Sequence, residues 1–142
     1  MTKSSNLTPD LIGAYEVTNF YVQADPGFTL NIGKFSEKLK AHLKKNGADS
    51  AIFITAWNPF SKQLSDKENR FRNEMLKKEL IGRSLKFLDG FGQDPAGKWT
   101  EEESFLVLGI SLEAAKKLGN QFEQNAIVWS DSDAVPQLIM LR

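Results

Sequence analysis

The sequence predicts a single compact α/β (α+β) domain over residues 1–142, in which a mixed, mostly antiparallel sheet is flanked by about three main helices. Three observations predict this fold class. Short runs rich in β-branched and aromatic residues alternate with segments of helical periodicity. Several of these runs are joined by short turns, which link antiparallel strands, whereas parallel strands need long crossovers. A length of 142 residues suits one domain that buries its own core.

The first predicted elements are a short helix and a hairpin. Thr8-Pro9 is typical of an N-cap and first helical position, and the helix is expected to end by Gly13, so that residues 1–14 form an N-terminal arm or short helix. Residues 15–22 alternate and predict a strand. After an Asp-Pro-Gly turn signal, residues 28–32 alternate again, which predicts an antiparallel hairpin.

A lysine-rich helix is expected next. Ser36 is its predicted N-cap and Asn46-Gly47 its C-terminal stop. The apolar stripe of this helix is expected to consist of Phe35, Leu39 and Leu43. Residues 51–57 are almost entirely apolar on both faces, which predicts a central strand.

The longest helix opens with a capping box formed by Ser65 and Glu68 and runs to about Gly82. A short strand is predicted at residues 85–89. The glycines and the proline of residues 90–97 then predict a long loop.

The last third of the chain repeats the alternation. Residues 105–110 predict a second central strand, Ser111 caps a further helix, residues 126–129 predict a third buried strand and residues 136–141 a final one. The similar order of elements in the two halves suggests tandem ββαβ units.

The residue inventory excludes several classes of function. Lys+Arg and Asp+Glu both number 18, there is one His, and there is no Cys. The chain therefore has no disulfide framework, no Cys-ligated zinc, no iron–sulfur cluster, no thiol nucleophile and no multi-histidine metal site. Zero net charge makes nucleic acid an unexpected partner. Because the chain begins with polar residues and has no apolar run long enough for a bilayer, we expect a cytoplasmic protein that needs no cofactor.

Two amides on the long helix indicate a candidate site. Asn69 and Asn73 share one helical face with Leu76 and Leu80. This half of the helix follows the loop at 57–59, beyond the end of a central strand, where α/β proteins commonly bind ligands. Amides recognise polar, uncharged groups. The alternative is that both side chains hydrogen-bond the backbone of the neighbouring loop.

Two arginines flank these amides. Arg70 and Arg72 can bind an anion at the same helix end. The alternative is a solvated helix face, with Arg70 paired to Glu74 and Arg72 beside Glu68.

A run of three glutamates provides the second candidate. Alternation along the following strand places Glu102 and Ser104 on one face, where they form a candidate acid–base or hydrogen-bonding pair. A second carboxylate, from Asp131 or Asp133, would be needed for a carboxylate pair or a magnesium site. The alternative is that Asp131 and Asp133 belong to an ordinary turn.

Three functions follow from these observations. The first is a non-enzymatic binding module for a small polar ligand or a protein partner, with a cleft of amide, hydroxyl and indole groups. The cleft is predicted to contain Thr55, Trp57, Asn58, Asn69, Asn73, Glu102, Ser104, Gln124 and Asn125. The second is a hydrolase or metal-assisted enzyme that uses Glu102 with Asp131. The third is a structural protein–protein interaction domain.

Several segments together resemble a known family. These are ITAWNP at 54–59, LSDKEN at 64–69, GQDPAGKW at 92–99, EES at 102–104 and FEQNAIVW at 122–129. In this order they resemble a family of small bacterial proteins classed as a domain of unknown function, over about residues 15–141. Trp57 stands where that family often has Tyr, and Glu103 where it often has Pro. The resemblance implies a bacterial, cytoplasmic, stand-alone domain and assigns no activity, cofactor or catalytic residue.

Overall fold

The computed structural model describes residues 9–97 and 101–142, and these residues confirm the α/β class. The helices are α1 (Pro9–Val17), α2 (Glu37–Lys45), α3 (Asp66–Gly82) and α4 (Leu112–Gln121), with a 3-10 turn η1 at Pro59–Ser61. The strands are β1 (Asn19–Val22), β2 (Phe28–Leu30), β3 (Ala51–Ile54), β4 (Lys86–Gln93), β5 (Glu102–Leu108), β6 (Ala126–Ser130) and β7 (Gln137–Met140). Thr8, the predicted N-cap of the first helix, lies outside the described residues.

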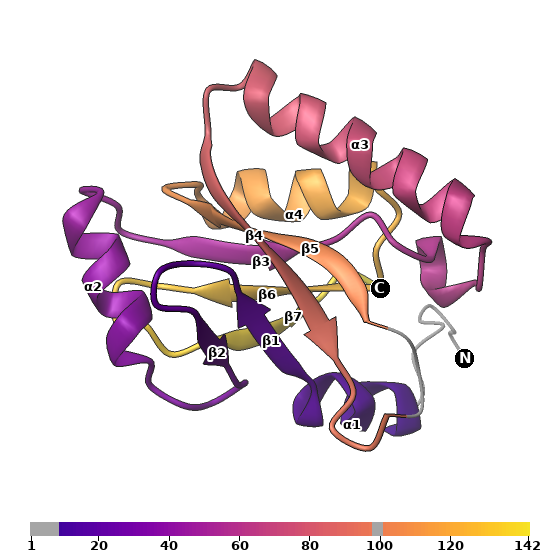
Figure 1. The fold of residues 1–142 in the computed structure, drawn as a ribbon, viewed down its shortest axis with the longest axis horizontal. Helices are drawn as coiled ribbons and strands as arrows, with labels where there is room; N and C mark the ends of the chain where they lie inside the picture. The colour runs from indigo at the N-terminus through magenta and orange to yellow at the C-terminus, as the bar shows by residue number, and fades with distance from the viewer. Residues whose placement is uncertain (1–8, 98–100) are drawn as a thin grey trace.

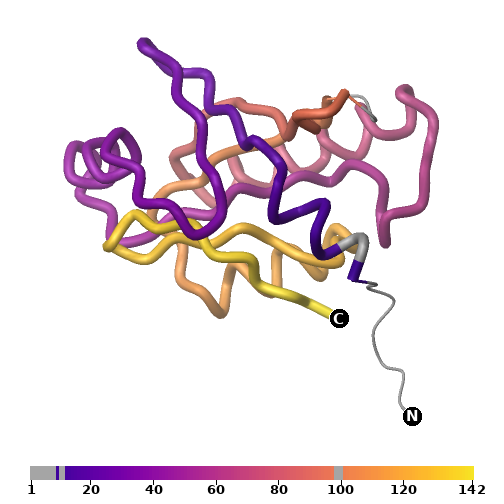
Figure 2. Tube along the Cα trace, turned by 90° about the horizontal axis from the view of Figure 1, so that it is seen from below, coloured from indigo at the N-terminus to yellow at the C-terminus, as the bar shows by residue number. Residues whose placement is uncertain are grey.

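The seven strands form one sheet in the order β2-β1-β4-β5-β3-β6-β7, and every pairing in it is antiparallel. The sheet curls, so that its two ends approach each other (Figures 1 and 2). Backbone hydrogen bonds connect the segment after β2 with the segment before β7: Gly33 N–H donates to Pro136 O at 2.8 Å and Ser36 N–H to Ala134 O at 2.9 Å. The result is a half-barrel.

The tandem arrangement is present in the order of elements but not as separate modules. The order ββαβ occurs as β1-β2-α2-β3 and again as β4-β5-α4-β6. In the sheet, however, β4 and β5 lie between β1 and β3. The two units are therefore interleaved and share one sheet.

One face of the sheet is covered by α3 and α4, which lie together in Figure 1. Alternation along the strands sends Ile52 and Ile54 to this face and Ala51 and Phe53 to the other. The core beneath α3 and α4 consists mainly of Ile52, Ile54, Leu76, Leu80, Phe105, Val107, Ala115, Leu118, Ile127 and Trp129. These side chains bury the apolar stripes of both helices.

The opposite face is covered by α2 over one part and by α1 over another. Leu39 and Leu43 of α2 pack on this face, as predicted, and Ser36 caps the helix through its hydroxyl. Phe35 is an exception, because it precedes the N-cap, lies outside the helical stripe and is 60% exposed. The core here consists mainly of Phe20, Val22, Phe28, Leu30, Leu39, Leu43, Phe53, Leu106, Leu108 and Val128.

Two boundaries predicted from the sequence are wrong. The first helix does not end by Gly13 but continues to Val17, so the strand begins only at Asn19. Thr18 closes the helix, since its hydroxyl donates to Ala14 O at 2.6 Å. The sequence also predicts a central strand that reaches residue 57, but β3 ends at Ile54.

The predicted loop at residues 90–97 is the third correction, because its first half, residues 90–93, belongs to β4. Gly90 and Gly92 are buried inside the strand, which pairs with β1 on one side and β5 on the other. A Cβ at Gly90 would collide with the backbone oxygen of Tyr21 and press on the ring of Phe53. Glycine here permits close packing rather than a turn.

Candidate functional site

A cavity of about 260 Å³ lies between α1 and the curled sheet. In Figure 2, α1 lies beside the β6–β7 hairpin, which is drawn in yellow. The described residues that line the cavity come from α1, six strands and the loops around residues 55–61 and 124. They are Ala14, Tyr15, Thr18, Phe20, Phe53, Ile54, Thr55, Trp57, Asn58, Ser61, Gly92, Glu102, Ser104, Gln124, Ala126, Ile127, Val128 and Leu138.

Strand register explains why the cavity forms on this face. Gly92 is paired with both Glu102 and Phe20, so these three residues form a row across β1, β4 and β5. Glycine contributes no side chain to the row. Ser104, the next position of β5 on the same face, contributes only a hydroxyl group. The sheet therefore leaves open space beneath α1 where larger side chains would fill it.

The floor of the cavity is apolar. Phe20 and Phe53 meet edge to face, with ring centroids 5.2 Å apart, and Val128 and Leu138 line the side formed by β6 and β7. The sequence predicts a cleft of amide, hydroxyl and indole groups with one carboxyl, that of Glu102. The aromatic and aliphatic floor is thus an addition to that prediction.

Glu102 is the acidic group of the cavity. Its side chain is half-buried, and burial raises its pKa to about 7, while a hydrogen bond with the Asn58 side chain opposes the rise. Burial also raises the pKa of Tyr15, which hydrogen-bonds Ser61 and feels the negative charge of Glu102. A carboxyl with this pKa changes its protonation state near neutral pH.

The orientation of Asn58 is set by its other contacts. Its Oδ1 accepts hydrogen bonds from the Leu64 N–H at 3.0 Å and from Asn69 Nδ2 at 2.8 Å. Because the oxygen is used in this way, the amide nitrogen is the atom available to donate to Glu102.

The loop that carries Asn58 has an unusual backbone. Asn58, Phe60 and Ser61 have φ values of 47°, 52° and 62°, and Glu123, whose carbonyl accepts from the Phe60 N–H at 2.6 Å, has a φ of 58°. Non-glycine residues rarely adopt the left-handed region, and such residues concentrate at functional sites. The loop therefore needs contacts that hold it.

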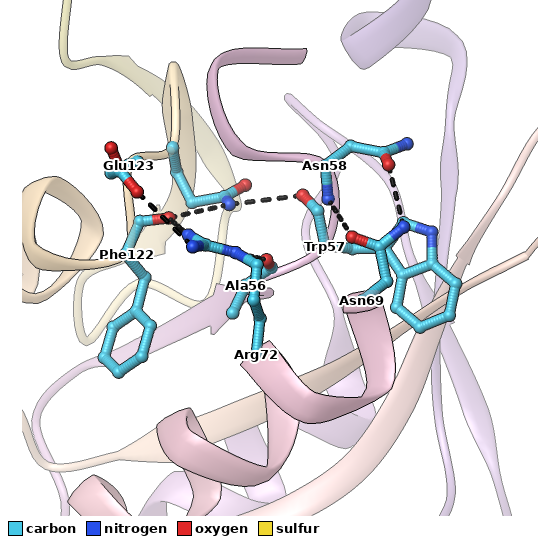
Figure 3. A network of polar contacts seen from close by, with 8 residues as sticks. Ala56, Trp57, Asn58, Asn69, Arg72, Phe122 and Glu123 are labelled. Atoms are coloured by element: carbon cyan, nitrogen blue, oxygen red, sulfur yellow. Dashed lines mark hydrogen bonds and ion pairs between the residues drawn. The ribbon is translucent and has the colours of Figure 1, made fainter. Parts of the chain in front are cut away.

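Asn69 and Asn73 provide two of these contacts. Asn69, only 1% exposed, accepts from the Asn58 N–H at 2.7 Å and donates to the Asn58 side chain (Figure 3). Asn73, 4% exposed, accepts from the Ala56 N–H at 2.8 Å and donates to the Glu103 carbonyl at 2.7 Å. Both amides hydrogen-bond the neighbouring backbone, as the alternative interpretation of this pair predicted.

Arg72 provides a third contact and is neither an anion site nor part of a solvated face. Its guanidinium donates to the Ala56 carbonyl at 2.9 Å and the Phe122 carbonyl at 2.7 Å, and it lies 3.3 Å from the Glu123 carboxylate (Figure 3). The fixed fork of an arginine suits this role. Gln124 completes the connection, since its Nε2 lies 3.2 Å from both the Trp57 and the Phe122 carbonyl oxygens.

A comparison with protein families establishes membership. A model described as protein of unknown function (DUF3293) matches residues 54–127. The chain belongs to this family. No curated protein and no solved structure matches it. The resemblance inferred from the sequence to a family of unknown function is thereby confirmed.

The DUF3293 match runs from the end of β3 to the start of β6 and includes most of the polar cavity residues. Of the nine predicted site residues, the cavity brings together Thr55, Trp57, Asn58, Glu102, Ser104 and Gln124. Asn69, Asn73 and Asn125 lie behind it. Asn69 and Asn73 hold the loop, and Asn125 donates to the Ser61 hydroxyl at 2.8 Å.

The structure separates Glu102 from Asp131. The cavity lies at the Ala126 end of β6, whereas Asp131 follows Ser130 at the opposite end, where it is exposed and its carboxylate accepts from the Ser132 N–H at 2.7 Å. The proposed Glu102–Asp131 pair is therefore wrong, because Asp131 belongs to a turn. Within residues 9–97 and 101–142, no cluster of three or more potential ligand side chains is placed to hold a metal ion, and no helix could cross a membrane.

The role of α1 as a wall of the cavity does not follow from the sequence patterns. The sequence predicts a strand at Tyr15 and Thr18 and the end of an arm or short helix at Ala14, whereas all three residues line the cavity. Because α1 has almost no apolar stripe, its sequence does not indicate which part of the protein it packs against. A helix that lies over a cavity has little core to face.

Proposed function

We propose that the protein binds a small molecule in the cavity between α1 and the curled sheet. The observation that carries the proposal is the combination of an apolar floor with a half-buried carboxyl and several hydroxyl and amide groups on one cavity. Ligand sites are typically concave and mostly apolar, with a few placed polar groups that orient the ligand.

The size of the cavity supports a ligand with a substantial apolar part. An apolar cavity of about 150 Å³ is enough to bind benzene. The cavity of about 260 Å³ found here therefore has room for a ring with a short polar chain. The sequence predicts a small polar ligand. The apolar floor formed by Phe20, Phe53 and Val128 favours instead a ligand with an apolar part and a polar part.

The loop that carries Asn58 supports the same proposal. Strained residues persist only where surrounding contacts determine them. Here Asn69, Arg72 and Gln124 hold the loop from behind, while Asn58 presents its side chain to the cavity. The polar network thus preorganises the cavity rim. This favours a small molecule over a protein partner. We also propose, from the sequence, that the protein acts in the bacterial cytoplasm.

The proposal is tested with three probes of similar size: 2-phenylethylamine, 2-phenylethanol and 3-phenylpropanoate. Each is titrated into ¹⁵N-labelled protein, and amide shifts are followed by NMR. We expect at least one probe to bind with a Kd of about 10 mM or tighter and to shift residues around the cavity. Ala126→Phe places a ring in the cavity and should abolish the shifts.

Thr29→Phe is the matched control, because it adds the same ring to an exposed position of β2. This variant should bind the probes as the unmodified protein does. If no probe shifts any cavity residue, or if Ala126→Phe binds as well as Thr29→Phe, the proposal is wrong.

A second candidate function is acid–base catalysis by Glu102, which its pKa of about 7 favours. The Ser104 hydroxyl donates to the backbone carbonyl of Glu102 at 2.9 Å, so Ser104 is not paired with the carboxyl as a nucleophile. Any such catalysis requires a substrate in the same cavity, and Ala126→Phe would abolish it together with binding.

A further inference from the structure

We infer that the ligand of the cavity is a small ammonium compound, whose positively charged group lies against Glu102 and whose apolar part contacts the aromatic floor. This inference rests on the proposed function and narrows it to one class of ligand. Three independent features of the cavity support it: its formal charges, the state of its hydrogen-bonding groups and its aromatic rings.

The charges on the cavity favour a cation. Glu102 is the one acidic side chain among the described residues that line it, and no Lys, Arg or His is present among those residues. Arg72, which holds the loop behind the cavity, is bonded to two carbonyl oxygens and to Glu123. A carboxylate or phosphate ligand would therefore be desolvated beside Glu102 without a cationic partner, which is costly.

The hydrogen-bonding groups of the cavity favour a donor ligand. Several donors are already engaged: Thr55 Oγ1 donates to the Glu103 carbonyl at 2.6 Å, Ser104 Oγ to the Glu102 carbonyl at 2.9 Å, and Gln124 Nε2 to carbonyl oxygens. Asn58 donates to the Glu102 carboxyl. The lone pairs of Ser104 Oγ and the carboxyl oxygens of Glu102 are acceptors. An ammonium group supplies up to three donors for them.

The aromatic rings favour a cation with an apolar body. Tyr15, Phe20, Phe53 and Trp57 all line the cavity, and they come from α1, β1, β3 and the loop after β3. The face of an aromatic ring attracts a cation, more strongly when the cation is desolvated. Rings combined with one carboxyl are a suitable environment for an organic ammonium ion, whereas hydrated metal ions prefer several oxygen ligands.

The binding of such a ligand should depend on pH. Tyr15 is the titratable side chain that faces Glu102 from α1, while the facing positions of β4 and of the loop after β3 are Gly92 and Asn58, which do not titrate. Glu102 loses its charge below about pH 7. An ammonium ligand lowers the pKa of this carboxyl, so it should release a proton on binding near neutral pH and bind more weakly in acid.

The test compares the three probes quantitatively at pH 8. We expect 2-phenylethylamine to bind at least about tenfold more tightly than 2-phenylethanol, equivalent to about 1.4 kcal/mol, because a hydrogen bond to a charged group is stronger than one between neutral groups. 3-Phenylpropanoate should bind most weakly. Lowering the pH to 6 should weaken the amine severalfold and leave the alcohol unchanged.

Glu102→Gln is the diagnostic variant and Glu103→Gln its control, since Glu103 is the exposed next residue of the same strand. Glu102→Gln should bind the amine and the alcohol within about threefold of each other. Glu103→Gln should keep the preference of the unmodified protein. Calorimetry in two buffers of different ionisation enthalpy gives a measurement that needs no variant, and it should show release of about half a proton per amine bound at pH 7.

Different failures are distinguishable. If the alcohol or 3-phenylpropanoate binds the unmodified protein as tightly as the amine, or if no proton is released, the inference of an ammonium ligand is wrong and the proposed function stands. If none of the three probes binds, both are wrong.

Discussion

The two faces of the same sheet are built differently. Under α3 and α4 the strands present branched and aromatic side chains, and Ile52, Leu76, Leu80, Val107 and Leu118 are fully buried. Under α1 the sheet presents Gly92, Ser104 and Glu102, and a cavity remains. The same strands form both faces of the sheet. The cavity therefore comes from small and polar residues at specific positions of β4 and β5.

Helix α3 contributes both to the packed core and to the cavity. The buried face of α3 provides Leu76 and Leu80 to the core and, one to two turns earlier, Asn69 and Asn73 to the loop of the cavity. Helix α3 therefore stabilises the core on its own face of the sheet and also positions the loop at the rim of the cavity on the other face. Stability and binding should respond differently to changes on the two faces.

The largest expected effect comes from truncating a leucine on the closed face. Leu80→Ala should lower the free energy of unfolding by about 2–5 kcal/mol, since Leu80 is 0% exposed and its removal leaves a cavity in a packed core. Leu138→Ala, the same change at a half-buried position that lines the cavity, should cost only about 1 kcal/mol. Urea denaturation measures the free energy of unfolding of both variants. Equal losses in the two variants would contradict the difference between the packed face under α3 and α4 and the face with the cavity.

The next effect concerns the amides behind the cavity. Asn73→Ala removes the acceptor of the Ala56 N–H and the donor to the Glu103 carbonyl, so it should lower the free energy of unfolding by about 2–3 kcal/mol. Asn120→Ala, on the exposed surface of α4, should cost no more than about 0.5 kcal/mol. A loss in Asn73→Ala no larger than in Asn120→Ala would show that the network does not hold the loop.

Much of the fold follows from local sequence patterns. The capping box at Ser65 and Glu68 and the helix caps Ser36 and Ser111 are formed as predicted. The buried strands β3, β5 and β6 lie where expected, although β3 ends at Ile54 and β5 begins already at Glu102. Local patterns failed where tertiary contacts decide the structure. From the sequence alone, Gly90 predicts a turn. In the structure a glycine is needed at this position inside β4 because Tyr21 and Phe53 pack directly on it.

The site was predicted only in its polar part. Glu102, Ser104 and Asn58 stand out in the sequence because they are polar and lie beside apolar strands. The apolar floor does not stand out, since Phe20, Phe53 and Val128 resemble any core residues. Separating Asn69 and Asn73 from the cavity required knowing which backbone groups lie opposite their amides, and this depends on the path of the loop.

A smaller effect on stability than those of Leu80→Ala and Asn73→Ala is the pH dependence due to Glu102. Its pKa is raised in the folded protein from 4.5 to about 7, so between these values the folded state binds more protons than the unfolded state. Stability from this group is therefore present at low pH and lost as the pH rises to about 7. The loss should be about 1–2 kcal/mol, since partial exposure reduces the effect, and Glu102→Gln should remove it.

The central claim is that Glu102 is a partly desolvated carboxyl on a ligand cavity, and the most direct test is its own titration. The ¹³C shift of the Glu102 side-chain carboxyl, followed by NMR against pH, should give a pKa of about 7 in the free protein. Saturating 2-phenylethylamine should lower that pKa by at least about one unit, equivalent to tenfold in affinity. A pKa near 4.5 in the free protein, unchanged by the amine, would contradict the account.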